Sequence, residues 1–384
     1  MRRTFLLHHR MPTLYLSLLV QTLATLLLWF SCLPIVGQVH AEAPITPSTP
    51  SGLHTQISDP VITGSGPTQT TQYNISGGTR PGGVNGTNLF HSFGDFNVPT
   101  NNIANFLNGV SFDVNGTPLQ AGLPTSNILG TVTGVNPSII FGAIQTNGTG
   151  GFGKANLFLM NPHGFLFGPN ASVNVGGMVA FTTADYLGFQ RTDTLFNKVS
   201  TPESLSLLST VPVTAFGFLG SNPAAIAIQG STFRVAQGQT LSFVGGNTGF
   251  KNYINPDTGI RSSTSVPDGV TMTGGKLLAL GGQINITSVA SPGEVSAADF
   301  MPALGMTMGE ISLSQGALLD VSADAAGTVR IRGGQFVIAD ATISANTVNS
   351  PGAQTALDIK VTGDLLISDT RGLPAMTEIG RAHV

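Results

Sequence analysis

Side chains able to carry catalysis or hold a metal are few in this sequence and far apart. The single cysteine, Cys32, lies near an apolar N-terminal run, and the histidines after residue 41 are His54, His91, His163 and His383. Their spacing does not match that of a zinc site, whose ligands usually come in close pairs. We therefore expect no metal, no cofactor and no thiol nucleophile.

Paired carboxylates are the second source of chemistry to test. Asp320 and Asp324 form the closest acidic pair in the second half of the chain, followed by Asp364 and Asp369. Two carboxylates hydrolyse a glycosidic bond only at a suitable separation across a cleft. The Gly-rich run GGTRPGG at residues 77–83 lacks the strand–loop–helix setting that phosphate binding needs. We expect these aspartates in exposed turns and predict no enzyme active site.

The aromatic run NLFHSFGDFNV at residues 88–98 is a candidate ligand cage. Aromatic residues bury large apolar areas, so at this density they more often pack in a core or a cap. We expect Phe90, Phe93 and Phe96 to pack in this way, with His91 at the surface or in a hydrogen bond.

Short Asn-Pro corners interrupt strand-like runs that are almost uncharged. Residues 154–186 read KANLFLMNPHGFLFGPNASVNVGGMVAFTTADY. Proline fixes φ and lacks an N–H, so it ends strand pairing, and an Asn side chain can bond its own backbone two residues on. In Asn161-Pro162-His163-Gly164 these properties predict a rigid corner, where Gly164 permits positive φ. From the residue types alone, such a stretch is more often a simple turn.

The composition places the chain among globular proteins with an unusual surface. Charged residues make up 9% of the sequence, against about 25% in ordinary soluble domains. Hydrophobic residues make up 41%, and the chain contains 49 glycines, which excludes the low-hydrophobicity, high-charge signature of disorder. The formal charge of −3 provides no basic patch for nucleic acid.

Short runs of Val, Ile, Leu, Phe and Thr, bounded by Gly, Asn and Pro, predict an all-β chain. The best helical candidate, Leu195–Leu208, contains Pro202 and is expected to be a loop or an extrusion. The second half is loosely repetitive, as in GQTLSFVGG (238–246), GGKLLALGGQINITSV (274–289), GEISLSQGALLDVSA (309–323) and GTVRIRGGQFVIADATISA (327–345).

Two all-β architectures fit these runs. Asn-Gly turns would suit the hairpins of a sandwich or barrel, whereas loose repeats suit a solenoid, in which each unit needs a neighbour to bury its apolar face. Low charge favours the solenoid, because identical charges stacked opposite one another repel. We expect a right-handed parallel β-helix with rungs of roughly 20–25 residues.

The two termini predict processing. Three arginines precede an apolar run from Leu14 to Phe30, and the following VGQVHAEA predicts signal-peptide cleavage after Ala41. An uncleaved membrane anchor is the alternative, because the apolar run is long. Residues 379–384, IGRAHV, match the translation of a widely used sequencing adapter, and the repeat pattern still runs at GDLLISDT (363–370). We expect an artefact there and a longer gene; a natural end is the alternative.

Four stretches carry a family resemblance: YNISGGTRPGGVNGTNLFHSFGDFNVP (73–99), ILGTVTGVNPSIIFGAIQTNG (128–148), ANLFLMNPHGFLFGPNASVNVGGMVAFTTADYLGF (155–189) and FLGSNPAAIAIQGSTFRVAQGQTLSFVGG (218–246). In this order they resemble the N-terminal secretion domain of filamentous-haemagglutinin-like exoproteins. These exoproteins belong to the two-partner secretion systems of Gram-negative bacteria.

The resemblance implies a right-handed β-helix with an N-terminal cap and short extra-helical strands. It also implies a partner, an outer-membrane β-barrel transporter whose periplasmic receptor domains recognise the secretion domain. One family motif, Asn-Pro-Asn-Gly-Ile, corresponds here to Asn161-Pro162-His163-Gly164-Phe165. The nearest counterpart of the other, Asn-Pro-Asn-Leu, is Asn136-Pro137-Ser138-Ile139, where only Asn and Pro match.

We expect five segments: a signal peptide (1–41), a linker (42–51), the secretion domain (52–250), the start of a β-helical repeat region (251–378) and the adapter artefact (379–384). The expected product is a non-enzymatic adhesin or haemagglutinin, secreted through the periplasm to the cell surface. A ligand on a host or neighbouring cell is a further expected partner. The alternatives are a carbohydrate-active β-helix enzyme, and a cytolysin or contact-dependent toxin whose effector region is missing here.

Overall fold

The computed structural model describes residues 43–49, 53–189, 195–197 and 209–368. The expected signal peptide with its cleavage site Ala41, the adapter segment with His383, Asp369 and most of 195–208 lie outside these residues. Within the described part there are only strands, turns and two short 3-10 helices, η1 (Gly66–Thr68) and η2 (Gly83–Asn85). No helix in this part is long and apolar enough to span a bilayer.

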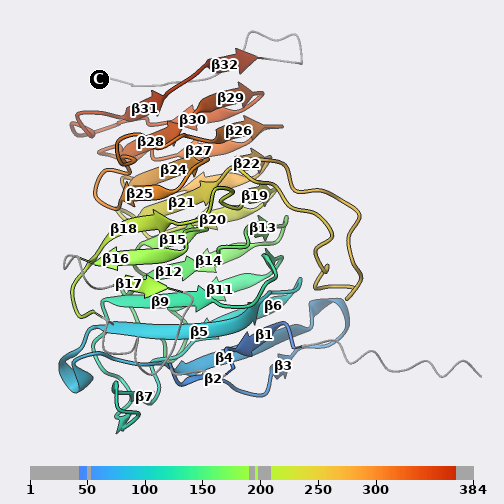
Figure 1. The fold of residues 1–384 in the computed structure, drawn as a ribbon, viewed down its shortest axis with the longest axis vertical. Helices are drawn as coiled ribbons and strands as arrows, with labels where there is room; N and C mark the ends of the chain where they lie inside the picture. The colour runs from blue at the N-terminus through green and yellow to red at the C-terminus, as the bar shows by residue number, and fades with distance from the viewer. Residues whose placement is uncertain (1–42, 50–52, 190–194, 198–208, 369–384) are drawn as a thin grey trace, which may run out of the picture. The chain divides into compact units, whose positions relative to one another are not determined.

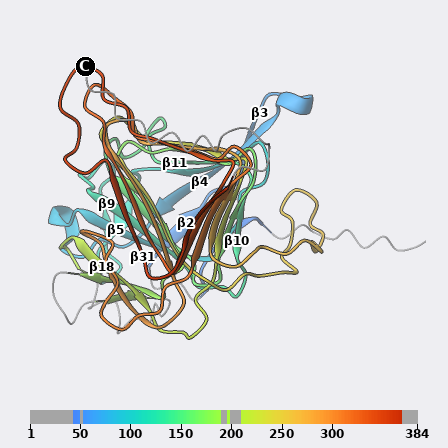
Figure 2. The ribbon, with the colours of Figure 1, turned by 90° about the horizontal axis from the view of Figure 1, so that it is seen from above.

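The described chain from Ala43 onward winds into a three-sided coil of parallel strands (Figures 1 and 2). Each turn passes from a first sheet to a second and then to a third face while rising toward the C-terminus, and seen from above it is right-handed (Figure 2). The expected right-handed parallel β-helix is confirmed, and the alternative of hairpin-linked sheets is excluded for the coil.

The first sheet contains nine strands, and all but its outermost pair run parallel. In spatial order they are β1 (Ile45–Pro47), β5 (Asn88–Phe96), β9 (Asn127–Val132), β12 (Asn156–Met160), β15 (Val179–Thr182), β21 (Thr240–Gly246), β24 (Gln283–Val289), β28 (Thr328–Gly333) and β31 (Leu357–Val361).

The second sheet contains seven parallel strands: β10 (Ser138–Ile140), β13 (Phe165–Phe167), β19 (Ile226–Gln229), β22 (Val270–Thr273), β26 (Glu310–Ser314), β29 (Gln335–Ala339) and β32 (Leu365–Ser368). The third face begins with β2 (Thr55–Ile57), β3 (Val61–Thr63), β4 (Thr70–Gly77), β6 (Asn102–Phe106), β11 (Ala143–Gln145) and β14 (Ser172–Asn174). It continues with β20 (Thr232–Arg234), β23 (Lys276–Leu278), β27 (Leu318–Asp320) and β30 (Thr342–Ser344).

The interior of the coil is filled by columns of apolar side chains stacked in register. Alternate residues of a strand point to the same face, so each strand adds like on like to its neighbour. In the first sheet one such column is Leu89, Ile128, Leu157, Val179, Leu241, Ile284, Val329 and Leu357. This stacking is why apolar and small residues alternate in the sequence.

The N-terminal edge of the coil is closed by antiparallel strands. Strand β1 pairs with β5, and β2 and β3 both pair with β4. Ile45 in β1 is buried in the core at 2% exposure. Residues 42–51 were expected to be a linker, and this is wrong for 45–47, which form part of the cap.

The turns of the coil are less regular than the expected 20–25 residues. One turn leads from Leu157 to Val179, whereas the next leads from Val179 to Leu241. The longer turn makes room for an antiparallel extra-helical sheet, in the order β17 (Leu195–Asn197), β16 (Tyr186–Phe189), β18 (Val213–Phe218) and β25 (Gly293–Ser296). A further extra-helical pair is β7 (Ser111–Phe112) with β8 (Pro118–Leu119). Because these extra-helical segments are inserted between strands of the coil, the sequence shows no fixed repeat length.

The extra-helical sheet covers the outside of the first sheet and creates a second hydrophobic core. The outward side chains Phe90, Leu129 and Phe158 are at most 5% exposed, because β16 and β18 pack over them with Phe216 and Phe218. The aromatic run 88–98 is therefore packing, as expected, with Phe90 in this outer core and Phe93 and Phe96 inside the coil.

Candidate functional site at the Asn-Pro corners

The two Asn-Pro motifs lie on the same corner of the coil in consecutive turns. Residues 136–137 connect β9 to β10, and residues 161–164 connect β12 to β13. Because β9 pairs with β12 and β10 pairs with β13, the two corners stack directly. Motifs separated in the sequence thus form one site between the first and second sheets.

Asn161 is the polar centre of this site. Its side chain is fully buried, and its Nδ2 donates to the carbonyl oxygen of Asn136 at 3.0 Å and to Ser138 Oγ at 2.9 Å. Its Oδ1 accepts the backbone N–H of His163 at 2.9 Å, which is the expected turn-forming bond two residues on. One amide therefore rigidifies its own corner and ties it to the corner below.

Asn136 extends the same column toward the N-terminus. It is exposed, and its Nδ2 donates to Asp95 Oδ1 at 3.1 Å. Asn97 Oδ1 accepts the backbone N–H of Ile139 at 2.9 Å. Sequence reasoning missed Asp95 and Asn97, although they end the aromatic run at the same point of the preceding turn.

The column also continues toward the C-terminus, without asparagine. Thr183 follows β15, and its Oγ1 donates to the carbonyl of Ala224 at 2.7 Å and accepts the N–H of Gly246 at 3.0 Å. Four successive turns thus carry a polar side chain that bonds neighbouring backbone at this corner, namely Asn97, Thr133 (whose Oγ1 donates to the carbonyl of Phe93 at 3.0 Å), Asn161 and Thr183. The signal in the sequence was a short polar residue directly after each strand of the first sheet.

Gly164 completes the corner and cannot readily be another residue. Its φ is +107°, and a Cβ there would lie 2.6 Å from Phe250 Cε1 and 3.0 Å from the carbonyl oxygen of Ala225. Pro162 and His163, with Pro137 in the corner below, are half-buried. The surface of this site is therefore formed by Asn136, Pro137, Pro162 and His163 over a buried amide.

The histidines do not come together. His54 stacks on Phe112 with ring centroids 4.7 Å apart, whereas His163 lies at the Asn-Pro corner. His91 is buried inside the first turn between Phe93 and Phe106, and burial lowers its pKa from 6.5 to about 3. Among the described residues no group of His, Cys, Asp and Glu is arranged to hold a metal ion.

Both aspartates of the repeat region accept hydrogen bonds from residues of nearby turns. Asp320 Oδ1 accepts the N–H of Ser322 at 2.9 Å, and Asp324 Oδ1 accepts a bond from Asn349 Nδ2 at 3.0 Å. Carboxylates used in this way stabilise the corners between rungs. Asp324 lies in an exposed bend, as expected, whereas Asp320 is the half-buried last residue of β27, so the expected exposed turn is wrong for Asp320.

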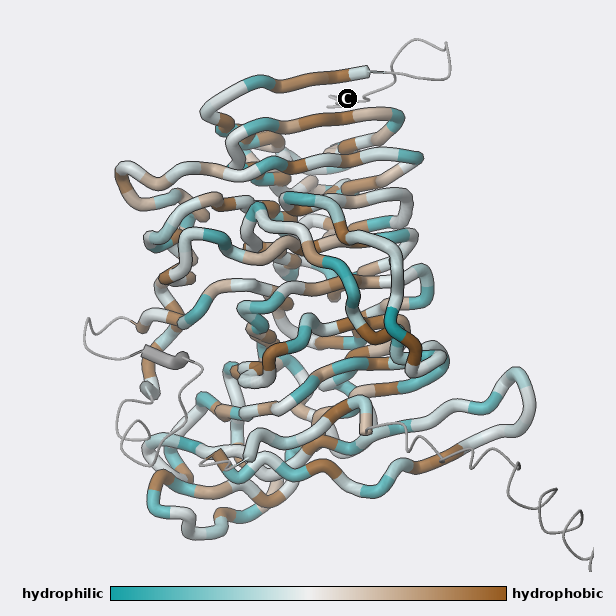
Figure 3. The backbone as a smooth tube through the Cα atoms, turned by 45° about the vertical axis from the view of Figure 1, so that its right-hand side comes forward, coloured by the Kyte–Doolittle hydropathy of each residue, from teal (hydrophilic) through white to brown (hydrophobic). Residues whose placement is uncertain are grey.

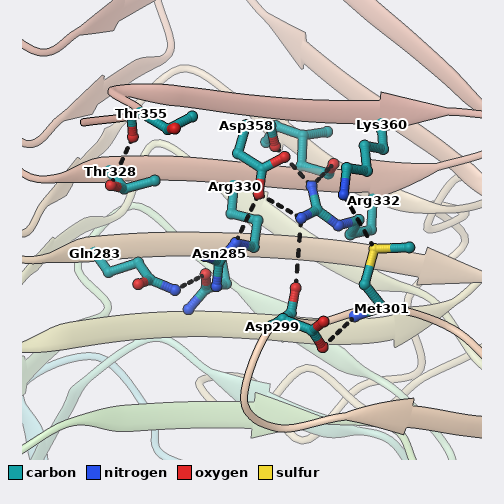
Figure 4. A network of polar contacts seen from close by, with 11 residues as sticks. Gln283, Asn285, Asp299, Met301, Thr328, Arg330, Arg332, Thr355, Asp358 and Lys360 are labelled. Carbon is teal, nitrogen blue, oxygen red and sulfur yellow. Dashed lines mark hydrogen bonds and ion pairs between the residues drawn. The ribbon is translucent and has the colours of Figure 1, made fainter. Parts of the chain in front are cut away.

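A cluster of charges that the sequence did not reveal lies on the outside of the first sheet near its C-terminal end (Figure 4). Arg332 is 2% exposed and donates to Asp358 Oδ2 at 2.5 Å, and Arg330 donates to the same oxygen at 3.1 Å. The bond from Arg332 is the main cause that lowers the pKa of Asp358. Two guanidinium groups thus share one carboxylate, and strand register alone brings these side chains together.

Comparison with known proteins gives one family. A family model described as the TPS secretion domain matches residues 54–331. Among solved structures, the crystal structure of the filamentous hemagglutinin secretion domain is similar at 16% identity and a TM-score of 0.34, covering 86% of this chain and 98% of that one. The HMW1 secretion domain from Haemophilus influenzae is similar at 15% identity and a TM-score of 0.36, covering 82% of this chain and 83% of that one. No curated protein sequence matches this chain significantly.

Proposed function

The chain belongs to the family of TPS secretion domains of two-partner secretion exoproteins, and we propose that an outer-membrane transporter recognises it and that its coil then seeds the folding of the exported product. Membership of this family confirms the resemblance seen in the sequence. The family serves secretion and is not an enzyme family, and its members are parts of secreted exoproteins.

The observation that carries the seeding role is the difference between the two ends of the coil. Antiparallel β1 and β2 cover the hydrogen-bonding edge at the N-terminal end. Toward the C-terminus each rung is stacked in parallel on the one before it, β29 on β26 and β32 on β29, so that every rung presents a hydrogen-bonding edge to the next. An edge of this kind can accept another parallel strand.

Adding a rung to this open end is favourable because it buries apolar side chains on a template that already exists. Each fully buried Leu, Ile or Val contributes roughly 1.5–3 kcal/mol. Growth in this direction, away from the closed cap, supports outward movement of a chain that crosses the membrane extended and folds outside.

Recognition by the periplasmic receptor domains of the transporter is assigned to the Asn-Pro corners. In support, Asn136, Pro137, Pro162 and His163 reach the surface together, and Asn161 fixes the backbone beneath them. We place the family's secretion signal at 52–250, although the coil runs without interruption across residue 250 because β19 pairs with β22. The proposed product is a secreted or cell-surface adhesin.

The experiment is an export assay in Gram-negative cells that produce the full chain with and without its cognate transporter. Deleting residues 52–250 should abolish transporter-dependent release, and Asn161→Ala should reduce it, because that change unties the two corners. Asn174→Ala is the matched control, since Asn174 is an exposed asparagine on the third face. Export that survives the deletion unchanged would overturn the proposal, and binding of the released protein to erythrocytes tests the adhesin role.

A further inference from the structure

One segment outside the coil lies against the Asn-Pro corners. Residues 247–268 leave the first sheet after β21, run along the outside of the second sheet and return to form β22 (Figures 1 and 3). The two arms of the segment pair with each other, because Val266 N donates to the carbonyl of Phe250 at 2.7 Å and Ser262 N donates to that of Tyr253 at 2.8 Å. The segment is thus a defined ribbon.

This ribbon covers an apolar column on the outward face of the second sheet. Ile139, Leu166 and Ala227 stand in register on β10, β13 and β19, and each is 1% exposed. Together with Ala225, which precedes β19, and Val266 of the ribbon, they form a separate small core. Phe250 and Tyr253 of the ribbon pack against this core.

The same column changes character where the ribbon ends. Beyond Ala227 its next members are Thr271 and Ser312. The column is therefore fully buried and apolar under the ribbon and polar in the two turns that follow, before it continues with Val337 and the exposed Leu366. An apolar outward face is unexpected on a solenoid whose interior is already filled, so these side chains need a cover.

Two contacts fasten the ribbon to parts of the chain that precede it. The ring of Phe250 lies against Gly164 so closely that any Cβ there would collide with it. At the tip, both carboxylate oxygens of Asp257 accept bonds from Thr100, from its N–H at 2.6 Å and its hydroxyl at 2.7 Å. The ribbon therefore spans the turns from Thr100 to β22 and closes over one side of the Asn-Pro corner.

The order of the chain makes closure a late event. The covered strands β10, β13 and β19 all precede residue 247, so their outward column exists before the ribbon arrives. Their inward side chains Ile140, Phe165, Phe167, Ile226 and Ile228 belong to the main core and do not depend on the ribbon. Until residues 247–268 close, an uncharged apolar surface borders the corners.

We propose that residues 247–268 are a latch, which competes with the receptor domains of the transporter for Ile139, Leu166 and Ala227 beside the Asn-Pro corners. The inference rests on the proposed function. An open latch leaves these side chains available to an apolar surface of the receptor, and a closed latch buries them, so that closure releases the folded protein. A receptor that needs the open state binds in proportion to the fraction that is open.

The test titrates the purified full chain and three variants with the isolated periplasmic receptor domains of the cognate transporter. Phe250→Ala removes the ring over Gly164, and Asp257→Ala removes both bonds to Thr100. Ile260→Ala is the matched control, because Ile260 lies in the same segment but is 68% exposed.

The Phe250→Ala variant is expected to bind about tenfold more tightly than the native chain, equivalent to about 1.4 kcal/mol. Asp257→Ala should show a smaller gain in the same direction, and Ile260→Ala no change. Equal affinities for native, Phe250→Ala and Asp257→Ala would overturn the latch. Circular dichroism shows whether Phe250→Ala keeps its coil; if it does not, Asp257→Ala decides, since that carboxylate is exposed.

A native chain diluted from urea into the receptor separates this inference from the proposed function. If the receptor binds the diluted chain but does not distinguish the folded variants, the latch is wrong and transporter recognition stands. If the receptor does not bind even the diluted chain, recognition itself fails.

Discussion

The turns of the coil from β5 to β21 differ from those from β24 to β31 on their outer faces, while their interiors are alike. On the first sheet, one outward column begins with Phe90, Leu129 and Phe158 and ends with Arg330 and Asp358. The early members are covered by the extra-helical sheet, whereas the late members form a partly exposed charge cluster (Figure 4). The interior specifies a coil, and the outer covering distinguishes the part that carries the Asn-Pro corners.

The polar ladders of the two regions differ in the same way. In the early turns Asn127 donates to Asn88 and Asn156 donates to Asn127, both at 2.8 Å, so that neutral amides pair up the stack. In the late turns Arg330 and Arg332 share Asp358. Amides can stack on themselves without repulsion, whereas two arginines on one face of the same strand need a carboxylate on the neighbouring strand.

The largest effect is expected from breaking what the two regions share, the interior. Phe181 is fully buried and packs against other aromatic rings. Its ring centroid lies 4.7 Å from that of Phe167 and 5.6 Å from that of Phe243. Phe181→Ala should cost about 3–5 kcal/mol of unfolding free energy, because it leaves a cavity. Urea unfolding measures this, and a cost as small as that of the solvent-exposed control Val135→Ala would contradict a filled interior.

A smaller effect, confined to the late turns, is expected at the charge cluster. Asp358→Asn leaves the buried Arg332 without its ionised partner and should cost about 1.5–3 kcal/mol. Because the native pKa of Asp358 is lowered, its contribution is present above the ordinary pKa of 3.8 and is lost as pH falls through the native value. Hydrogen exchange should show faster opening of β28 and β31, with the exposed Asp364→Asn as control. Equal effects on β9 and β12 would contradict a boundary between the regions.

The early turns should carry a different pH dependence, through His91. Its pKa is about 3 in the folded protein and ordinarily 6.5, so below 6.5 the unfolded chain binds a proton that the folded chain does not. Stability should therefore fall by about 1.4 kcal/mol per pH unit, or roughly 2 kcal/mol by pH 5. His91→Leu should remove this slope in pH-dependent urea unfolding, and His54→Asn should not. A slope that persists in His91→Leu would place the acid-sensitive group elsewhere.

The repeating interior could be predicted from the sequence because each strand alternates apolar with small or polar residues. The corners at Asn136 and Asn161 could be located for a similar reason, since Asn-Pro ends a strand. Their stacking could not be predicted, because register depends on how many residues each turn inserts. For the same reason the sequence did not predict that Phe250 lies against Gly164 or that Asp257 bonds Thr100. It also did not predict that Ile45 belongs to a cap.

The most direct test of the account is segment-resolved hydrogen exchange of the full chain under native conditions. If the early turns are a covered template and the late turns are added to it, the amides of β9, β12 and β15 should open only with global unfolding. Those of β31 and β32 should open at the lowest free energy. Equal protection along the coil, or greater protection at β31 than at β12, would contradict the account.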